Sequence, residues 1–278
     1  MKIGALISIS RSKNIDDQFR ALAELELNCC QTLFWDTSLY TREVADQLKA
    51  ASLKYGVEIT AIWAGWAGPM EWNFTGGPVT LGLVPAAYRD SRLKELFRAS
   101  DFLQMVGVTD MITHVGFLPE NPNDPDFVGV VAALRSLCKH LKKRGQYFLF
   151  ETGQETPVTM LRAIEHIGTG NVGINFDTAN LICYGKANSA DALEVFGKYV
   201  RNTHCKDGVY PQCGDFLGEE VPLGQGKANL PAVFGKLKEL GYTGPYIVER
   251  EITGEQQIAD IKMGRDLIRS VLRDLDIE

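Results

Sequence analysis

Residues 146–177 read QYFLFETGQETPVTMLRAIEHIGTGNVGINFD, and this stretch decides the fold. It opens and closes with short apolar runs, 146–151 and 172–177, and each run ends in an acidic residue. Near-continuous apolar runs are typical of parallel strands that are covered on both faces. The residues between them, 156–167, have the spacing of an amphipathic helix. The stretch therefore predicts a strand–helix–strand unit with Glu151 and Asp177 at the carboxyl ends of its strands.

The same alternation continues in both directions along the chain. Further strands are expected at 2–8, 28–35, 57–64, 109–115, 199–205 and 245–250. Further helices are expected at 15–26, 41–55, 86–105, 126–144, 189–198, 229–240 and 255–274. Eight strands alternating with eight helices predict an α/β fold, a single (β/α)8 TIM barrel over residues 1–278, with a doubly wound sheet as the alternative.

Two connections are longer than a barrel turn needs, at about 64–85 and 207–226. Both follow the carboxyl ends of predicted strands. In barrel enzymes the active site lies on that face, and long loops in a compact domain are usually functional. We therefore expect the active site at the carboxyl ends of strands five to eight, with these two loops beside it.

Composition and charge narrow the class of partner. The chain has 29 Lys and Arg against 35 Asp and Glu, a net charge of -6, and shows no basic stripe for nucleic acid. No stretch approaches the roughly 20 apolar residues of a membrane span, and the N-terminal apolar stretch is too short for a secretory leader. The six cysteines form no CxxC pair. We expect a cytoplasmic protein with reduced thiols, no membrane partner, and a small-molecule ligand.

Four potential metal ligands fall at the ends of the last four predicted strands: Glu151, Asp177, His204 and Glu249. Neighbouring strands lie about 4.8 Å apart, so these side chains can converge on one ion. Three carboxylates and one imidazole suit Mn²⁺ or Mg²⁺ and tolerate Co²⁺ or Zn²⁺. Each residue alone is equally well explained as a strand cap or an ion-pair partner. All four together, on adjacent strands and one face, predict a single divalent-metal site.

The chain also resembles the xylose-isomerase-like TIM-barrel superfamily, which includes ketose 3-epimerases and pentulose-5-phosphate 3-epimerases. The resemblance covers the whole strand–helix layout and is most specific after about residue 145. It is carried by FETG (150–153), FDTAN (176–180), THCKD (203–207), VPLGQG (221–226) and PYIVERE (245–251). The resemblance implies that the four residues bind one divalent ion, usually Mn²⁺. It also implies that Glu151 and Glu249 are the catalytic acid/base pair.

This resemblance implies a metal-dependent isomerase or epimerase acting on a sugar or sugar phosphate. In such a reaction a proton leaves the carbon beside a carbonyl, giving a cis-enediolate whose charge a divalent ion stabilises as a Lewis acid. The motifs are most similar to the pentulose-5-phosphate 3-epimerase pattern, because Asn180 stands where free-ketose enzymes carry histidine. No arginine follows His204 before Glu249; Tyr210 holds that position, and Lys206 is the nearest cation.

Five further residues are candidates for binding substrate: His114, Glu155, Asn180, Lys206 and Trp66. His114 ends strand four and is equally well explained as a structural residue. Glu155 can bind a hydroxyl or simply favour the first turn of a helix, and Lys206 can contact a substrate oxygen or pair with Asp207.

An aromatic cluster and a glycine-rich turn can each be explained either by function or by structure. The aromatic residues Trp63, Trp66, Trp72 and Phe74 can pack on a sugar or form an oligomer contact, and the resemblance implies a homodimer or homotetramer. The glycines of Gly224-Gln225-Gly226 can cradle a phosphate, although a turn into a helix needs glycine as well.

Other functions remain open on the same fold. An inosose-dehydratase-type lyase or a hydroxypyruvate-isomerase-type enzyme would use the same ligands. A nuclease like endonuclease IV assembles three zinc ions from many histidines, whereas this chain has four in total. A sugar-binding barrel without activity has no need for two metal-bound glutamates. Fold alone does not choose among these functions.

Overall fold

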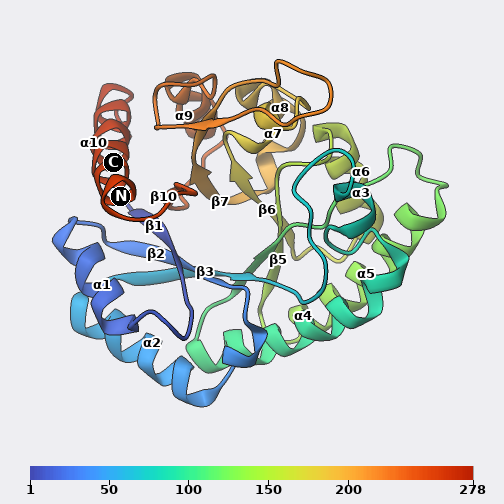
Figure 1. Cartoon of the computed structure of the whole chain (residues 1–278), viewed down its shortest axis with the longest axis horizontal. Coiled ribbons are helices and arrows are strands. Elements are labelled where there is room, and N and C mark those ends of the chain that lie inside the picture. The colour runs from blue at the N-terminus through green and yellow to red at the C-terminus, as the bar shows by residue number, and fades with distance from the viewer. Residues whose placement is uncertain (278) are drawn as a thin grey trace.

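The computed structural model describes residues 1–277 and shows a closed barrel of eight parallel strands (Figure 1). Around the barrel the strands follow the order β1-β10-β7-β6-β5-β4-β3-β2. Their bounds are β1 Ile3–Ser8, β2 Cys29–Phe34, β3 Glu58–Ala64, β4 Asp110–Thr113, β5 Tyr147–Glu151, β6 Val172–Asp177, β7 Val200–Cys205 and β10 Tyr246–Val248. The predicted (β/α)8 barrel is confirmed.

Eight long helices surround the barrel, and every one was expected from the sequence. They are α1 Ile15–Glu24, α2 Arg42–Tyr55, α4 Ala86–Val106, α5 Pro125–Lys142, α6 Pro157–Ile167, α8 Ser189–Phe196, α9 Leu230–Glu239 and α10 Glu255–Asp274. Side-chain oxygens cap several of them, as Thr41 does for α2 and Thr156 for α6. Three helices end at a left-handed glycine, Gly56, Gly107 and Gly168, with φ of 66°, 90° and 64°.

Short elements occupy the two long loops. The loop after β3 carries α3 Gly77–Thr80, and the loop after β7 contains β8 Asp207–Gly208 paired antiparallel with β9 Glu220–Val221. The remaining short elements are α7 Asn180–Cys183 and the 3-10 turns η1 Thr37–Leu39 and η2 Gly197–Tyr199. None of these was predicted, because pieces this short leave no periodic pattern in a sequence.

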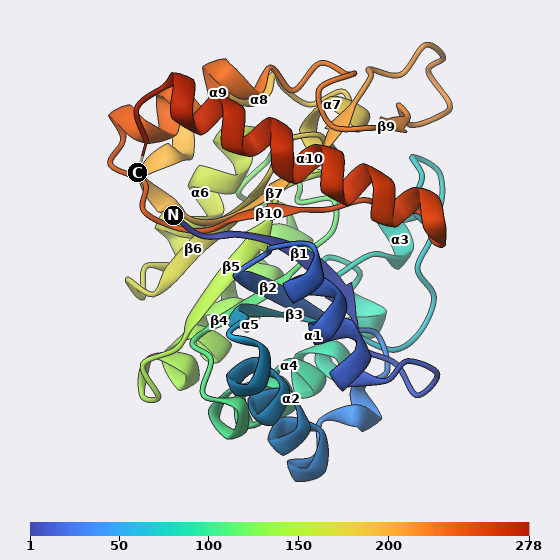
Figure 2. The same cartoon turned by 90° about the vertical axis from the view of Figure 1, so that its left-hand side faces the viewer.

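The first and last parts of the chain lie together, because β1 pairs with both β2 and β10 and so closes the barrel. Figure 2 shows α10 and α1 on either side of β1, with both termini at the same end of the molecule. Apolar side chains fill the space between strands and helices, and all six cysteines are free thiols. No helix within residues 1–277 combines the length and apolarity that a membrane crossing needs.

Candidate metal centre

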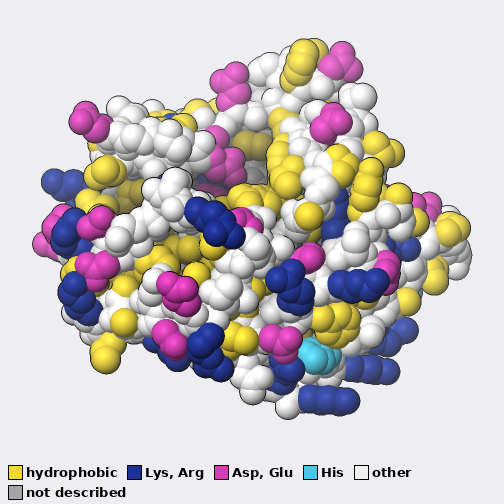
Figure 3. All heavy atoms as spheres, turned by 60° about the horizontal axis from the view of Figure 1, so that its bottom comes forward, with side chains coloured by type: hydrophobic (Ala, Val, Ile, Leu, Met, Phe, Trp, Pro, Cys, Tyr) yellow, Lys and Arg dark blue, Asp and Glu magenta, His cyan; other side chains and the backbone are white. Residues whose placement is uncertain are grey.

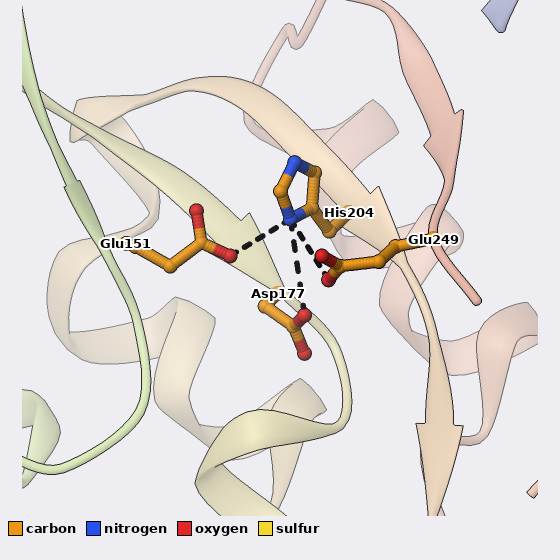
Figure 4. A group of neighbouring side chains, drawn as sticks. All are labelled: Glu151, Asp177, His204 and Glu249. Atoms are coloured by element: carbon orange, nitrogen blue, oxygen red, sulfur yellow. Dashed lines mark ion pairs between the residues drawn. The ribbon is translucent and has the colours of Figure 1, made fainter. Parts of the chain in front are cut away.

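The four proposed ligands meet at one end of the barrel (Figure 4). Glu151 and Asp177 are the last residues of β5 and β6, and His204 is the last but one of β7. Glu249 was expected within a strand, but β10 ends at Val248 and Glu249 follows directly. The register of the strands places these residues at about the same height in the barrel. Asp177 of β6 pairs with His204 of β7, and Ile247 of β10 pairs with His204 from the opposite edge of β7.

The ligand atoms of the four side chains converge on one point. His204 Nδ1 lies 2.7 Å from Glu151 Oε1, 3.1 Å from Glu249 Oε2 and 3.9 Å from Asp177 Oδ2. All four ligand atoms lie within 4.8 Å of one another. Three of them, on Asp177, His204 and Glu249, are buried without any hydrogen-bond partner. Buried polar atoms need a partner, and a divalent cation with a preference for oxygen and imidazole would satisfy all of these atoms at once.

Three of the four ligands are also fixed by their other polar atom. Glu151 Oε2 accepts a hydrogen bond of 2.6 Å from the Asn175 amide. Asp177 Oδ1 accepts two bonds of 2.7 Å from the backbone N–H groups of Ala179 and Asn180. The His204 ring contacts Gln31 Oε1 through Nε2 at 2.6 Å. A carbonyl oxygen only accepts, so Nε2 carries a proton, and Nδ1, which faces the carboxylates, is the nitrogen left to bind a cation or a second proton.

Gln31 links this histidine to a chain of buried amides across the barrel interior. Its Nε2 donates to Asn175 Oδ1 at 3.0 Å and to Asn202 Oδ1 at 3.2 Å. Asn202 in turn donates to Asp110, which pairs with Arg201. Partners of this kind orient metal ligands and fix the tautomer of a ligating histidine. The sequence did not predict Gln31; its one signal was a polar residue in the middle of the apolar run CCQTLF.

The electrostatics of the cluster favour a positive charge among the carboxylates. Burial raises the pKa of Glu151 and raises that of Asp177 well above its usual range. Burial alone would lower the pKa of His204, but Glu151 and Glu249 outweigh it and hold that pKa well above the usual range. A proton on the histidine or a divalent cation supplies the charge that three buried carboxylates require.

Lys206, two residues after His204, also reaches the cluster. Its Nζ lies 2.9 Å from Glu251, 3.5 Å from Glu249 and 3.9 Å from Asp177, and it donates to Asn180 Oδ1 at 3.3 Å. Burial opposes its charge, yet Glu249 and Glu251 outweigh that effect and raise its pKa well above the usual range. With His204 it also holds the pKa of Glu249 well below the ordinary value, against the effect of burial. The structure thus brings Lys206 and Asn180 to the four candidate ligands.

A cavity of about 840 Å³ opens onto the cluster. Its wall includes Glu151, Glu249, Asn180, Lys206 and His114. Figure 3 shows acidic side chains recessed in a hollow of the surface. His114 follows β4 directly, and its ring lies 5.8 Å from that of Trp63 and 5.2 Å from that of Trp72. Burial lowers its pKa to about 3, so the imidazole is neutral near pH 7.

Trp66 and Glu155 lie outside the wall of this cavity. Trp66 is only 2% exposed and packs behind the indoles that do line it, which belong to Trp35, Trp63 and Trp72. The cavity therefore has an aromatic side, and Trp66 packs against the indoles that form it without lining the cavity itself. Glu155 is buried within the loop after β5, where burial raises the pKa of its carboxyl to about 8.

The glycines of VPLGQG have a structural partner. Asp207 accepts hydrogen bonds from the backbone N–H groups of Gly224, Gly226 and Ala228, at 2.9–3.0 Å. A Cβ on Gly226 would collide with the Asp207 carboxylate, so this position requires glycine. These amides already bind a carboxylate, and the turn is therefore held to the beginning of the same loop.

Comparison with known proteins gives one family. The family model described as "Xylose isomerase-like TIM barrel" matches residues 19–271. The crystal structure of a xylose isomerase domain protein from Planctomyces limnophilus is 33% identical, with 99% of this chain and 98% of that one covered and a TM-score of 0.92. A curated protein of Methanocaldococcus jannaschii is 26% identical over 118 residues, which span 42% of this chain and 37% of that protein.

Two more distant structures share the fold alone. A D-tagatose 3-epimerase-like protein is 19% identical, with a TM-score of 0.75, 99% of this chain and 98% of that one covered. A xylose isomerase-like TIM barrel protein from Mycobacterium smegmatis, solved in complex with magnesium, is 18% identical, with a TM-score of 0.72 and coverage of 99% and 97%.

Proposed function

The chain belongs to the xylose isomerase-like TIM barrel family, and from that membership we propose that it is a metal-dependent isomerase or epimerase of a small sugar. The observation that carries the proposal is the convergence of four ligand atoms, three of them unpartnered, at the open end of the barrel. Epimerase-like structures and a magnesium complex among its structural neighbours support the same assignment.

Glu151, Asp177, His204 and Glu249 would hold one divalent ion, Mn²⁺ in our proposal, with Mg²⁺, Co²⁺ and Zn²⁺ as alternatives. When bound, this ion supplies Lewis-acid stabilisation of negative charge on the substrate oxygens. Asp177 has no other role in the proposal. Its Oδ1 is held by two backbone amides, and this anchoring fixes the carboxylate that the ion would meet.

Glu151 and Glu249 would move the proton. One carboxylate removes the hydrogen from the carbon beside the carbonyl, and the electron pair passes into an enediolate. The other carboxyl group returns a proton to the opposite face of the same carbon, which gives the epimer, or to the adjacent carbon, which gives the isomer. The environments of the two groups differ as such a pair requires: Glu151 has a raised pKa and Glu249 a lowered one.

The surroundings of the cluster favour a substrate without phosphate. Lys206 is paired with Glu251 and Glu249, and the amides of the GQG turn are bonded to Asp207. Both groups that would bind phosphate are thus already engaged. The indoles of Trp63 and Trp72, with the neutral ring of His114, form an apolar wall suited to the C–H face of a sugar ring.

The test is an assay of metal-stripped protein reloaded separately with Mn²⁺, Mg²⁺, Co²⁺ or Zn²⁺. Free ketoses, ketose phosphates, keto-glycosides and inososes are incubated in deuterated water and followed by NMR. Deuterium gained at one carbon with a change in configuration, dependent on the metal, is the expected result. Net loss of water would identify a lyase instead. Full turnover by the metal-free protein, or no exchange with any substrate, would contradict the proposal.

A further inference from the structure

The cavity at the metal cluster continues well beyond it. From the carboxylates it extends along β1 into the space between the first helix, α1, and the last, α10. Six of the side chains that line this extension are apolar, and Gln18 and Gln257 of the same helices line it as well. The apolar six are Ile7, Ala21, Leu22, Leu25, Ile258 and Ile261. We call these six residues the α1/α10 groove. One cavity therefore joins a cluster of buried carboxylates to an apolar groove.

The groove exists because the ring of helices is open at this point. Helix α1 packs on α2 and β1, whereas α10 packs on α9, β1 and β10. Figure 2 shows the two helices flanking β1 without lying against each other. At one end they are tied together, since Arg265 donates to the Leu25 carbonyl at 2.6 Å and Arg269 to Glu26 Oε2 at 2.8 Å. The groove is thus closed at that end and opens at the other onto the cavity of the metal cluster.

Size and polarity indicate what would fill it. Cavities that bind drug-sized ligands measure about 300–1,000 Å³, and the 840 Å³ of this one exceeds what a single free ketose fills. Ile258, on the rim, leaves 53% of its surface exposed. Gln18 also lines the cavity, one turn of α1 before Ala21 and Leu22, and its amide nitrogen is buried without a partner among the described residues. A ligand oxygen placed there would accept from this amide.

We propose that the α1/α10 groove is a subsite for an apolar alkyl or aryl substituent carried by the sugar, so that the substrate is a substituted sugar such as a glycoside. The placement of the sugar at the four carboxylate and imidazole ligands rests on the function proposed above. The binding of an apolar substituent in the groove does not depend on that function. The continuity of the groove with the carboxylates selects the substrate as its occupant, because a ligand held at the cluster can extend directly into it.

The experiment compares two probes by calorimetry on the Mn²⁺-loaded protein: methyl β-D-glucopyranoside and n-octyl β-D-glucopyranoside, the latter below its micellar concentration. Each methylene moved from water into an apolar cleft strengthens binding about fourfold. We therefore expect the octyl glucoside to bind at least tenfold more tightly. The variants Ala21→Trp, which fills the groove, and Ile258→Asp, which charges its rim, should remove this gain. Val158→Trp and Val158→Asp, on an exposed position of α6, are the matched controls and should keep it.

Equal affinity for both probes, or no binding of either, would overturn the subsite. The subsite would also be overturned if both groove variants kept the tighter binding of the octyl glucoside, because the octyl chain would then bind elsewhere as an adventitious additive only. A wild-type dimer that both groove variants convert to monomer in sedimentation experiments would identify a second copy as the occupant. The function proposed above is judged separately, by deuterium exchange into ketoses, so either idea can fail while the other stands.

Discussion

His204 Nε2 lies 2.6 Å from Gln31 Oε1, and this contact joins β7 to β2 through the barrel interior, between residues 173 positions apart in the sequence. It determines which ring nitrogen carries the proton. With Nε2 donating to the amide oxygen, Nδ1 is the nitrogen that faces Glu151 and Glu249 and is left to bind a cation between them. The amide of Gln31 cannot turn over, since its Nε2 is bonded to Asn175 and Asn202.

Gln31→Met should weaken metal binding 10- to 100-fold while the four ligands stay in place. The thioether fills the same volume but cannot hold the His204 tautomer, and it leaves Asn175 without its donor. The measurement is Mn²⁺ affinity by calorimetry. Gln146→Met is the control: Gln146 is a buried amide bonded to Ser100, away from the cluster. Comparable losses of Mn²⁺ affinity in both variants would show that Gln31 acts only through stability.

Glu151→Gln and Glu249→Gln should each lower turnover about 10²–10⁴-fold, because neither amide can accept the substrate proton. Metal content, measured by mass spectrometry, separates lost chemistry from lost binding. Glu251→Gln is the matched control, since Glu251 also pairs with Lys206 but stands outside the ligand cluster. Near-wild-type turnover by either metal-loaded ligand variant would remove that glutamate from the proposed proton transfer.

Most of the barrel was predictable because its signals are local. The apolar runs ending in Glu151 and Asp177 match β5 and β6, and the helix expected at 255–274 has those bounds in the structure. The ligand quartet followed from these strand ends. Their convergence could be predicted because adjacent strands of a parallel barrel end at about the same height, as the pairing of Asp177 with His204 shows.

What the sequence did not reveal depends on contacts between distant residues. Gln31 has no local partner; its role requires Asn175, Asn202 and His204 in the same layer of the barrel. Likewise, the spacing of aromatic residues after β3 could not tell which indoles face the cavity. Trp66 turned out to be buried, whereas Trp35, which precedes that loop, lines the wall.

Glu155 should make the protein less stable at high pH. Burial raises the pKa of its carboxyl to about 8 in the folded protein, from an ordinary value of 4.5. Between these values the folded state binds more protons than the unfolded state, so stability is present below pH 4.5 and is lost as pH rises to about 8. The full effect is at most roughly 5 kcal/mol.

Glu155→Gln should flatten this dependence, because an amide does not ionise. Thermal unfolding of both proteins at pH 6 and pH 8.5 measures the difference, and the variant should gain most at the higher pH. An equal change in Tm at both pH values would mean that the Glu155 carboxyl is ionised in the folded protein throughout this range.

Arg92 should control the order of the aromatic loop after β3. It is 1% exposed, and its guanidinium donates to the carbonyls of Thr80, Gly82 and Pro69 at 2.6–2.7 Å. Arg92→Met leaves these acceptors unpaired and should cost about 3 kcal/mol. Hydrogen exchange of residues 65–85 should accelerate. Arg98→Met, an exposed position on the same helix, should leave the loop unchanged, and equal exchange in both variants would exclude this role.

Asp207 and Gly226 should act together to hold the loop after β7 in its folded conformation. The carboxylate accepts from Gly224, Gly226 and Ala228, and hydrogen bonds to a charged group contribute about 1.5–3 kcal/mol each when they are buried. Asp207→Asn turns part of this acceptor into a donor that faces N–H groups, and Gly226→Ala drives a methyl group into the carboxylate.

Both variants should therefore release residues 207–228 and expose them to limited proteolysis. Because the loop begins three residues after His204, Mn²⁺ affinity should fall as well, though less than in a ligand variant. Gly235→Ala, where a Cβ meets nothing within 4 Å, is the control and should change neither readout. The double variant Asp207→Asn/Gly226→Ala should lose little beyond either single change, because both break the same contact. Fully additive losses of stability would show that the two residues act independently.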